Sequence, residues 1–143
     1  MDISMKKWGI LLLLASLCFF QVARANETIV VVANISDKSI QLNRQQIRNL
    51  YMGGMMPYDL NVIALSPDNV TRVIFNTKVV GLTESRIQSY WAQMRFTGRK
   101  KAPKEFANER TLLEYLIDNE GTLGYLRGST SIPDDLLVVY TID

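Results

Sequence analysis

The alternation of short apolar runs with amphipathic stretches most constrains how this 143-residue chain can fold. Residues 28–33 form a β-branched run bounded by polar residues, as expected of a buried strand, and residues 61–65 form a second one. Residues 123–126 and 136–142 have the pattern of the final strands. Because helical patterns separate these strands, the sequence predicts one α/β domain with a short mixed sheet and about four helices.

Capping signals place the first two helices. Asn43 precedes an apolar-periodic stretch and Gln46 follows three residues later, which is a capping box, and the glycines at 53–54 end this helix. Asp68 is predicted to cap a second helix that runs to about residue 78. Its expected buried face consists of Val70, Val73 and Ile74.

Two further helices follow. Thr83 is expected to start the third helix, a loop over residues 97–104 follows it, and Asn108 is expected to cap the last helix, which Gly121 ends. The apolar stripe of the third helix contains Ile87, Tyr90, Trp91 and Met94, with Phe96 also expected in the core. The inward residues of the last helix are expected to be Leu112, Leu113, Leu116 and Ile117.

The N-terminus has the features of a cleaved secretory signal. Lys6 and Lys7 precede an apolar run over residues 10–20, and Ala23 and Ala25 stand where a signal peptidase reads small residues. The run is shorter than the ~20 residues that span a bilayer. We therefore expect export to the periplasm, with residues 1–25 removed and residues 26–143 forming one domain without stable membrane insertion. The alternative is a lipoprotein signal at Cys18, but Leu17 before it is larger than that processing favours.

Cleavage would leave a formally neutral chain. It removes Lys6, Lys7, Arg24 and Asp2, so the 16 basic and 14 acidic residues both become 13. No net charge then attracts the protein to nucleic acid or an anionic membrane. The only cysteine, Cys18, leaves with the signal, so no disulfide is expected.

The absence of histidine restricts catalytic chemistry. Without histidine or a mature cysteine, nucleophilic schemes that need these residues and ordinary zinc sites are excluded. Asp134 and Asp135 form a carboxylate pair, but adjacent acids after Pro133 are more typical of a solvated turn. The sequence predicts no enzyme, no cofactor and no metal site.

The loop before the second helix is a candidate anion site. Free backbone N–H groups and the positive helix end favour anions there, and Ser66, Asn69, Thr71 and Arg72 could add donors and charge. The alternative is an ordinary capped helix whose donors are satisfied by Asp68, and on the residues alone we favour this alternative.

A short basic cluster contains Arg99, Lys100, Lys101 and Lys104. A solvated loop is the default interpretation of such a run. The functional interpretation of Arg99, Lys100 and Lys101 is a surface for an acidic partner, or a contact for an anion that arrives at the open edge of the lobe.

Several motifs together resemble one lobe of the periplasmic phosphate-binding proteins that feed ABC transporters. They are VVVAN (residues 30–34), IRNLYMGG (47–54), the YW…F.G pattern (90–98) and GTLGYL (121–126). The chain is also similar to small exported proteins that consist of this lobe alone. The resemblance implies a periplasmic-binding-protein-like fold and a solute-binding-like role, although the tryptophan expected after the first glycine pair is absent.

The resemblance implies weak or absent phosphate binding, because the ligand residues differ. The larger proteins place Ser-Gly-Thr at this helix start, where Asn69, Val70 and Thr71 stand here. Leu65 replaces their arginine and Pro67 their aspartate. A branched side chain then blocks the backbone, and the bidentate charge partner is lost.

Two hypotheses follow for function. The first is a solute-binding-like protein that holds phosphate or another oxyanion weakly. The second is an interaction module in a cell-envelope assembly, which uses the lobe to dock another protein or a second copy of itself. In that case the loops at residues 34–39, 66–71 and 97–104 are expected to form the docking face.

We predict cleavage between Ala25 and Asn26, because the Ala-x-Ala step follows an apolar segment too short to span a bilayer. N-terminal sequencing of the protein from a periplasmic fraction checks this. A mature chain that begins at lipid-modified Cys18 would contradict it.

Overall fold

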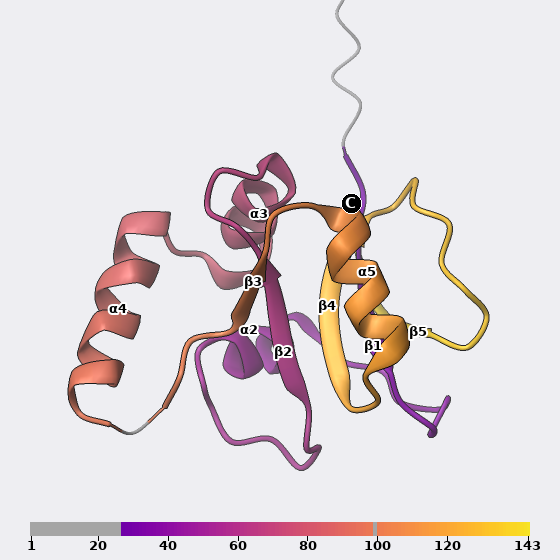
Figure 1. Ribbon diagram of the computed structural model, residues 1–143, viewed down its shortest axis with the longest axis horizontal. Helices are drawn as coiled ribbons and strands as arrows, with labels where there is room; N and C mark the ends of the chain where they lie inside the picture. The colour runs from indigo at the N-terminus through magenta and orange to yellow at the C-terminus, as the bar shows by residue number, and fades with distance from the viewer. Residues whose placement is uncertain (1–26, 99) are drawn as a thin grey trace, which may run out of the picture.

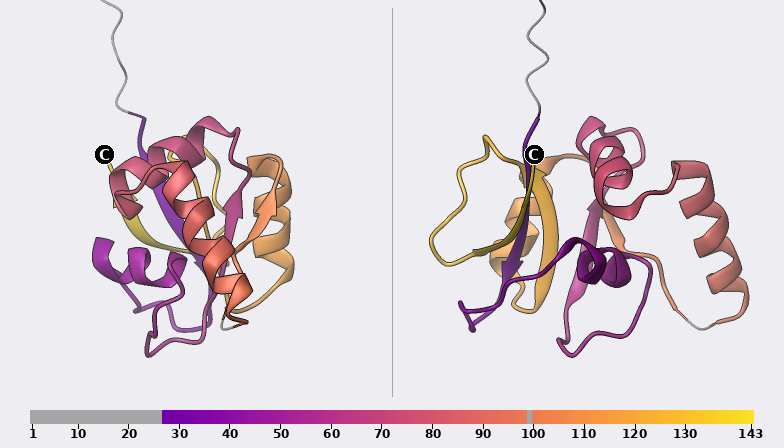
Figure 2. Two further views of the ribbon diagram at one scale, coloured as in Figure 1. Left: turned by 90° about the vertical axis from the view of Figure 1, so that its left-hand side faces the viewer. Right: turned by 180° about the vertical axis from the view of Figure 1, so that it is seen from behind.

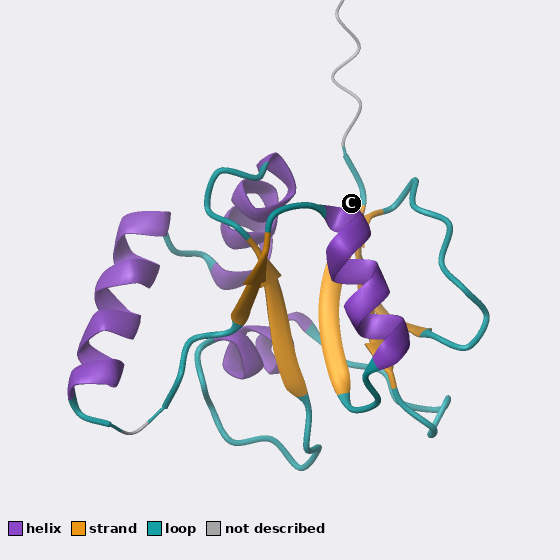
Figure 3. Ribbon diagram, in the orientation of Figure 1, coloured by secondary structure: helices purple, strands orange, loops and turns teal. Residues whose placement is uncertain are grey.

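The computed structural model describes residues 27–98 and 100–143; the expected signal peptide and Arg99 lie outside the described residues. The strands are β1 (Ile29–Asn34), β2 (Asn61–Leu65), β3 (Lys104–Phe106), β4 (Thr122–Arg127) and β5 (Leu137–Ile142). The helices are α2 (Arg44–Tyr51), α3 (Val70–Phe75), the π-helical η2 (Asn76–Val80), α4 (Glu84–Phe96) and α5 (Glu109–Asp118) (Figures 1 and 3). Within the described residues no helix is long and apolar enough to cross a membrane.

The strands form one mixed sheet with the order β3-β2-β4-β1-β5. β1 is antiparallel to both β4 and β5, whereas β2 is parallel to β3 and β4. α5 covers one face of the sheet and α2 and α3 cover the other, while α4 stands at the side of the molecule opposite β5 (Figures 1 and 2). The predicted α/β domain with a short mixed sheet is confirmed.

The strand register shows that the expected docking face was wrong. Asn34 at the end of β1 and Asn61 at the start of β2 both pair with Thr122 of β4. The loop after β1 therefore leaves the sheet at the end opposite the loop over residues 66–71. β3 runs parallel to β2, so residues 97–103 also enter at the end where β1 finishes. The three loops cannot form one surface because β1 runs antiparallel to β2.

The GTLGYL motif builds both faces of the central strand. Gly121 has a φ of +81° and donates its N–H to the Asn34 carbonyl oxygen at 2.7 Å. A Cβ at Gly124 would lie 2.9 Å from Leu112 Cδ2, so the glycine lets α5 approach the sheet. Tyr125 points to the other face and stacks on Phe75, with ring centroids 3.9 Å apart and planes at 6°. Because successive residues of a strand point to opposite faces, β4 packs against α5 with Gly124 and against α3 with Tyr125.

The predicted capping box is confirmed. Asn43 accepts from the Gln46 backbone N–H, and the Gln46 side chain accepts from the Asn43 N–H, each at 2.9 Å. Thr83 and Asn108 cap α4 and α5 as expected. Just before the box, Leu42 is buried and donates its N–H to Val139 O at 3.1 Å, which places this segment against the free edge of β5.

The cap predicted for α3 was wrong, and of its predicted buried face only Ile74 packs against the core. Asn69, not Asp68, caps this helix. Val70 and Val73 are 58% and 54% exposed, whereas Thr71 and Arg72 are buried. The polar residues lie inside because carboxylates from distant segments pair with them, a compensation that hydrophobic periodicity cannot detect. The helix continues as η2 and ends at Gly81, which has a φ of +70°.

α4 buries only part of its predicted stripe. Ile87 and Trp91 are buried and Tyr90 and Met94 are half-buried, but Phe96 is 96% exposed, so its expected core position was wrong. The C-terminal end of α4 extends away from the sheet (Figure 1), and Met94 still packs against the core while Phe96 does not. β3 was not predicted, because a three-residue strand with a half-buried pattern carries little sequence signal. On α5, Leu112 and Leu116 face inward as expected, whereas Ile117 is exposed.

Candidate functional site

The loop before α3, where an anion was expected, satisfies most of its own polar groups. Asn69 Oδ1 accepts the Thr71 N–H at 2.9 Å, and the Asn69 N–H donates to Ser66 O at 3.0 Å. The Ser66 hydroxyl donates to Asp68 Oδ1 at 2.7 Å. A carboxylate therefore lies at the helix start and competes with any incoming anion for the same donors.

Thr71 points away from the loop, to a second carboxylate. Its side chain is fully buried, and Oγ1 donates to Glu109 Oε1 at 2.6 Å. Arg127 Nε lies 3.2 Å from the same hydroxyl, 3.1 Å from Glu109 and 3.0 Å from Glu27. The hydroxyl is thus held by an ion pair between α5 and β4. In this arrangement Thr71 ties α3 to its neighbours.

Arg72 is the most enclosed charged group of the domain. It is 5% exposed, and Nε and Nη2 donate to the two oxygens of Glu84 at 2.9 and 2.5 Å. Nη1 donates to Leu65 O at 2.7 Å and lies 3.4 Å from Glu105 Oε1. The guanidinium therefore joins the end of β2, the first turn of α4 and the short strand β3. This bidentate geometry is the strongest common form of ion pair.

The environment of Glu84 keeps this pair ionised. Burial by itself raises the pKa of Glu84, but hydrogen bonds from Arg72, Gln88 and Asn76 outweigh burial and hold the pKa below its ordinary value. Burial lowers the pKa of Arg72, and its bonds to Glu84 more than offset this, so that pKa is raised. With Glu84 and Glu105 both beside it, Arg72 offers no unbalanced positive charge to an anion.

A small cavity lies beside Arg72, beneath α4. Its volume is about 120 Å³. Its walls include Tyr51, Phe75, Trp91, Arg95 and Tyr125. Since one water needs roughly 10–15 Å³, there is room for several waters, but the volume is well below the ~300 Å³ of ordinary ligand pockets.

The two tyrosines that line the cavity are held by the backbone. Tyr51 donates its hydroxyl to Ile63 O at 2.8 Å, and the Tyr125 hydroxyl accepts the Leu65 N–H at 3.1 Å. Burial raises the pKa of both hydroxyls, so they stay protonated at neutral pH. They order the β2 backbone and are not poised for proton transfer.

The structure divides the predicted basic cluster. Lys100 and Lys101 are exposed, and Arg99 lies outside the described residues. Lys104 belongs to β3, where its ammonium lies 4.5 Å from the ring centre of Tyr115 and 5.5 Å from that of Phe106. Lys104 thus takes part in a cation–π contact with the body of the domain, while Lys100 and Lys101 remain at the surface.

Sequence reasoning missed the three carboxylates that occupy the site. Glu84 and Glu109 each lie in the first turn of a helix, where an acid is ordinarily explained by the helix dipole. Glu105 stands in a strand that was not predicted. No local pattern links these residues to Thr71 or Arg72, because the contacts join segments far apart in the chain.

The fold is similar to that of known phosphate-binding components. A Clostridium perfringens protein assigned as a phosphate ABC transporter substrate-binding protein, with bound phosphate, matches with a TM-score of 0.61 and 16% identity over 79% of this chain and 44% of its own. An ABC-type phosphate transport receptor from Vibrio cholerae matches with a TM-score of 0.58 and 15% identity over 79% of this chain and 45% of its own. No family model and no curated protein matches the sequence.

The chain spans less than half the length of these two proteins. It has the fold of one lobe of a periplasmic binding protein, as the sequence motifs implied. At this level of identity the likeness establishes the fold, and the assignment of Ser66, Asn69, Thr71 and Arg72 to an anion stays a prediction.

We predict that Glu84→Gln destabilises the domain by about 2 to 3 kcal/mol at pH 7, because it leaves the buried Arg72 without its main charge partner. Because the folded-state pKa of Glu84 is lowered from 4.5, its contribution is complete above pH 4.5 and is lost as the pH falls through the folded-state pKa. Urea unfolding across this range is the measurement.

The matched control is Glu114→Gln. Glu114 forms an exposed i,i+4 pair with Arg110, and its loss should cost no more than about 0.5 kcal/mol. Wild type and Glu84→Gln should converge in stability in acid. A gap between them that persists below the folded-state pKa of Glu84 would show that the charge pair is not the cause.

Proposed function

We propose that the protein is an exported, periplasmic binding-protein-like lobe that holds oxyanions weakly or not at all and works as an interaction module in the cell envelope. The observation that carries this proposal is the state of Arg72. Of the four residues predicted to hold an anion it is the one that bears a positive charge, and its donors point to Glu84, Leu65 and Glu105.

Electrostatics supports the weak-binding part of the proposal. An oxyanion that reached Arg72 would have to displace a bidentate carboxylate or lie beside it, and like charges at such distances repel strongly. At the helix start, Asp68 and the Thr71–Glu109 pair add two more carboxylates.

The second candidate is a solute-binding-like role, which the fold similarity to phosphate-binding components favours. In that case Ser66, Asn69, Thr71 and Arg72 would contact phosphate at the α3 start after local rearrangement of their present hydrogen bonds. The role would be non-enzymatic and would need no cofactor.

We predict that calorimetry at low salt shows millimolar or undetectable binding of phosphate and sulfate. A millimolar constant corresponds to about 4 kcal/mol, which a few exposed helix-terminal amides can supply. Glu105→Gln removes a carboxylate 3.4 Å from Arg72 and should strengthen any phosphate binding by up to about tenfold, or 1.4 kcal/mol. Glu114→Gln should leave it unchanged. Micromolar affinity that Asn69→Ala or Thr71→Ala abolishes would refute the weak-binding proposal.

The interaction role is tested by cross-linking in intact cells. Ser66 is half-exposed just after the end of β2, and Lys101 is exposed shortly before the start of β3. We predict that a photoreactive side chain at either position captures another protein, whereas one at Glu114 on the outer face of α5 does not. If all three positions give only uncoupled monomer, the docking role is wrong, whatever the phosphate result.

A further inference from the structure

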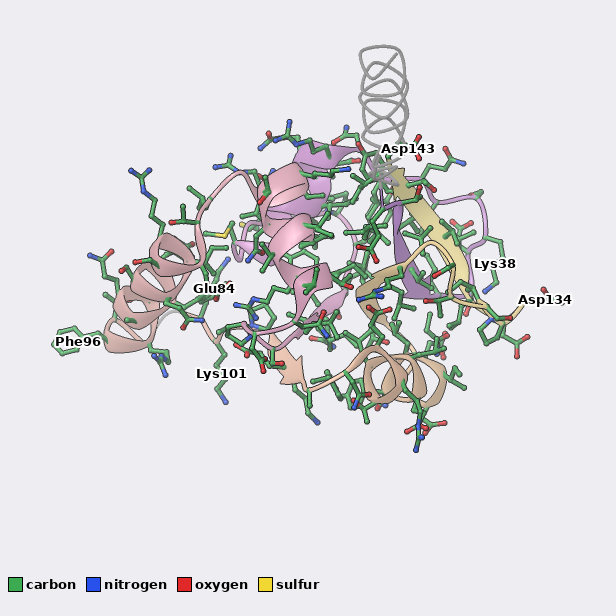
Figure 4. The ribbon with its side chains drawn as sticks, turned by 90° about the horizontal axis from the view of Figure 1, so that it is seen from above. Lys38, Glu84, Phe96, Lys101, Asp134 and Asp143 are labelled. Atoms are coloured by element: carbon green, nitrogen blue, oxygen red, sulfur yellow. The ribbon has the colours of Figure 1, made fainter. Side chains whose placement is uncertain are left out.

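The free end of α4 exposes an aromatic side chain with an apolar surround. Phe96, the last residue of the helix, is 96% exposed and projects from the end of the molecule farthest from Asp134 (Figure 4). Phe96 borders a shallow, open depression that is lined also by Ala92, Gln93, Met94 and Thr97. Removing the apolar surface of an exposed phenylalanine from water is favourable, so this end gains by being covered.

Positive charge surrounds this end of the helix. Arg95, Lys100 and Lys101 are exposed, and within the described residues no carboxylate forms an ion pair with any of them. Figure 4 shows Lys101 pointing outward on the same side of the molecule as Phe96. The neighbouring carboxylates Glu84 and Glu105 are both engaged with Arg72. The surface is therefore apolar at its tip and basic at its rim.

This charge decides between the candidate occupants. A symmetric dimer through α4 would bring the same basic groups face to face, and like-charge contacts across an interface are costly. A bilayer would need an apolar stripe along the helix, but the stripe of α4, Ile87 and Trp91, is buried against the body. An acidic protein surface can pair with the basic rim and can also cover the exposed Phe96 side chain.

We propose that the α4 tip, defined as Gln93, Arg95, Phe96, Lys100 and Lys101, docks an acidic partner protein that receives Phe96 in an apolar pocket. The inference rests on the proposed interaction role and names its surface. Phe96 serves as the buried anchor, since aromatic and arginine side chains are enriched at interface centres. Lys100 and Lys101 lie at the rim and govern association rate and salt dependence.

The experiment places a photoreactive side chain at the exposed Gln93, one turn from Phe96, in the full-length exported protein in intact cells. We expect one protein adduct, whose yield falls about tenfold with Phe96→Ala and again with the double reversal Lys100→Glu/Lys101→Glu. The control variants are Ile117→Ala and Arg110→Glu, an exposed apolar and an exposed basic residue on α5, and they should have no effect. Because Phe96 is exposed, Phe96→Ala should unfold at the wild-type temperature.

The captured protein is then purified, and its affinity for wild type and Phe96→Ala is measured at low and high salt. Tenfold weaker binding by Phe96→Ala, and affinity that falls with salt, support the proposal. An adduct of two copies of this chain, an adduct with lipid alone, or binding to phosphatidylglycerol vesicles that Phe96→Ala abolishes would overturn it. An adduct from Ser66 but none from Gln93 would refute the α4 tip as the docking surface, while the proposed interaction role would still be supported. If no position gives an adduct, both the α4 docking surface and the interaction role are refuted.

Discussion

The buried guanidinium of Arg72 is the interaction on which the rest of the domain depends. A charge removed from water costs several kcal/mol unless its donors are paired with good geometry. Here the partners come from three segments, the carbonyl of Leu65 on β2, Glu84 on α4 and Glu105 on β3. The hydrogen bonds and ion pairs of this one side chain therefore fix the relative positions of β2, β3 and α4.

The same kind of pairing extends to the start of α3, where polar side chains are engaged within the chain. Two donors of this helix are paired with carboxylates of the same chain, the Thr71 hydroxyl with Glu109 and the Arg72 guanidinium with Glu84. The helix position and the sheet order do not depend on what the loop holds. Function must accordingly be argued from these side chains and not from the fold.

Local signals were sufficient for much of the fold. The run Asn61–Leu65 and the capping box at Asn43 and Gln46 depend on neighbouring residues only, and both were predicted. The orientation of α3 was not, because it is set by partners 12 and 38 residues away along the chain.

The sequence predicted where the candidate site lies in the chain but not how its side chains are oriented. Sequence placed a loop with hydroxyl, amide and guanidinium groups between a strand and a helix, and the structure has this loop. It could not show that Arg72 turns inward, because the partners of its guanidinium come from separate segments. Nor could it show that Phe96 is exposed, because this depends on where α4 ends relative to the body. The long-range contacts, not the local patterns, decide which groups are available to a partner.

The hydrogen bond from the Leu42 N–H to the Val139 carbonyl covers part of the edge of the sheet at β5. Exposed edge strands invite pairing with strands of neighbouring molecules and can seed aggregation. Because the segment before α2 occupies part of the β5 edge, that edge is a poor template for another strand. At this edge of the sheet, a second copy of the domain is therefore less able to add a strand.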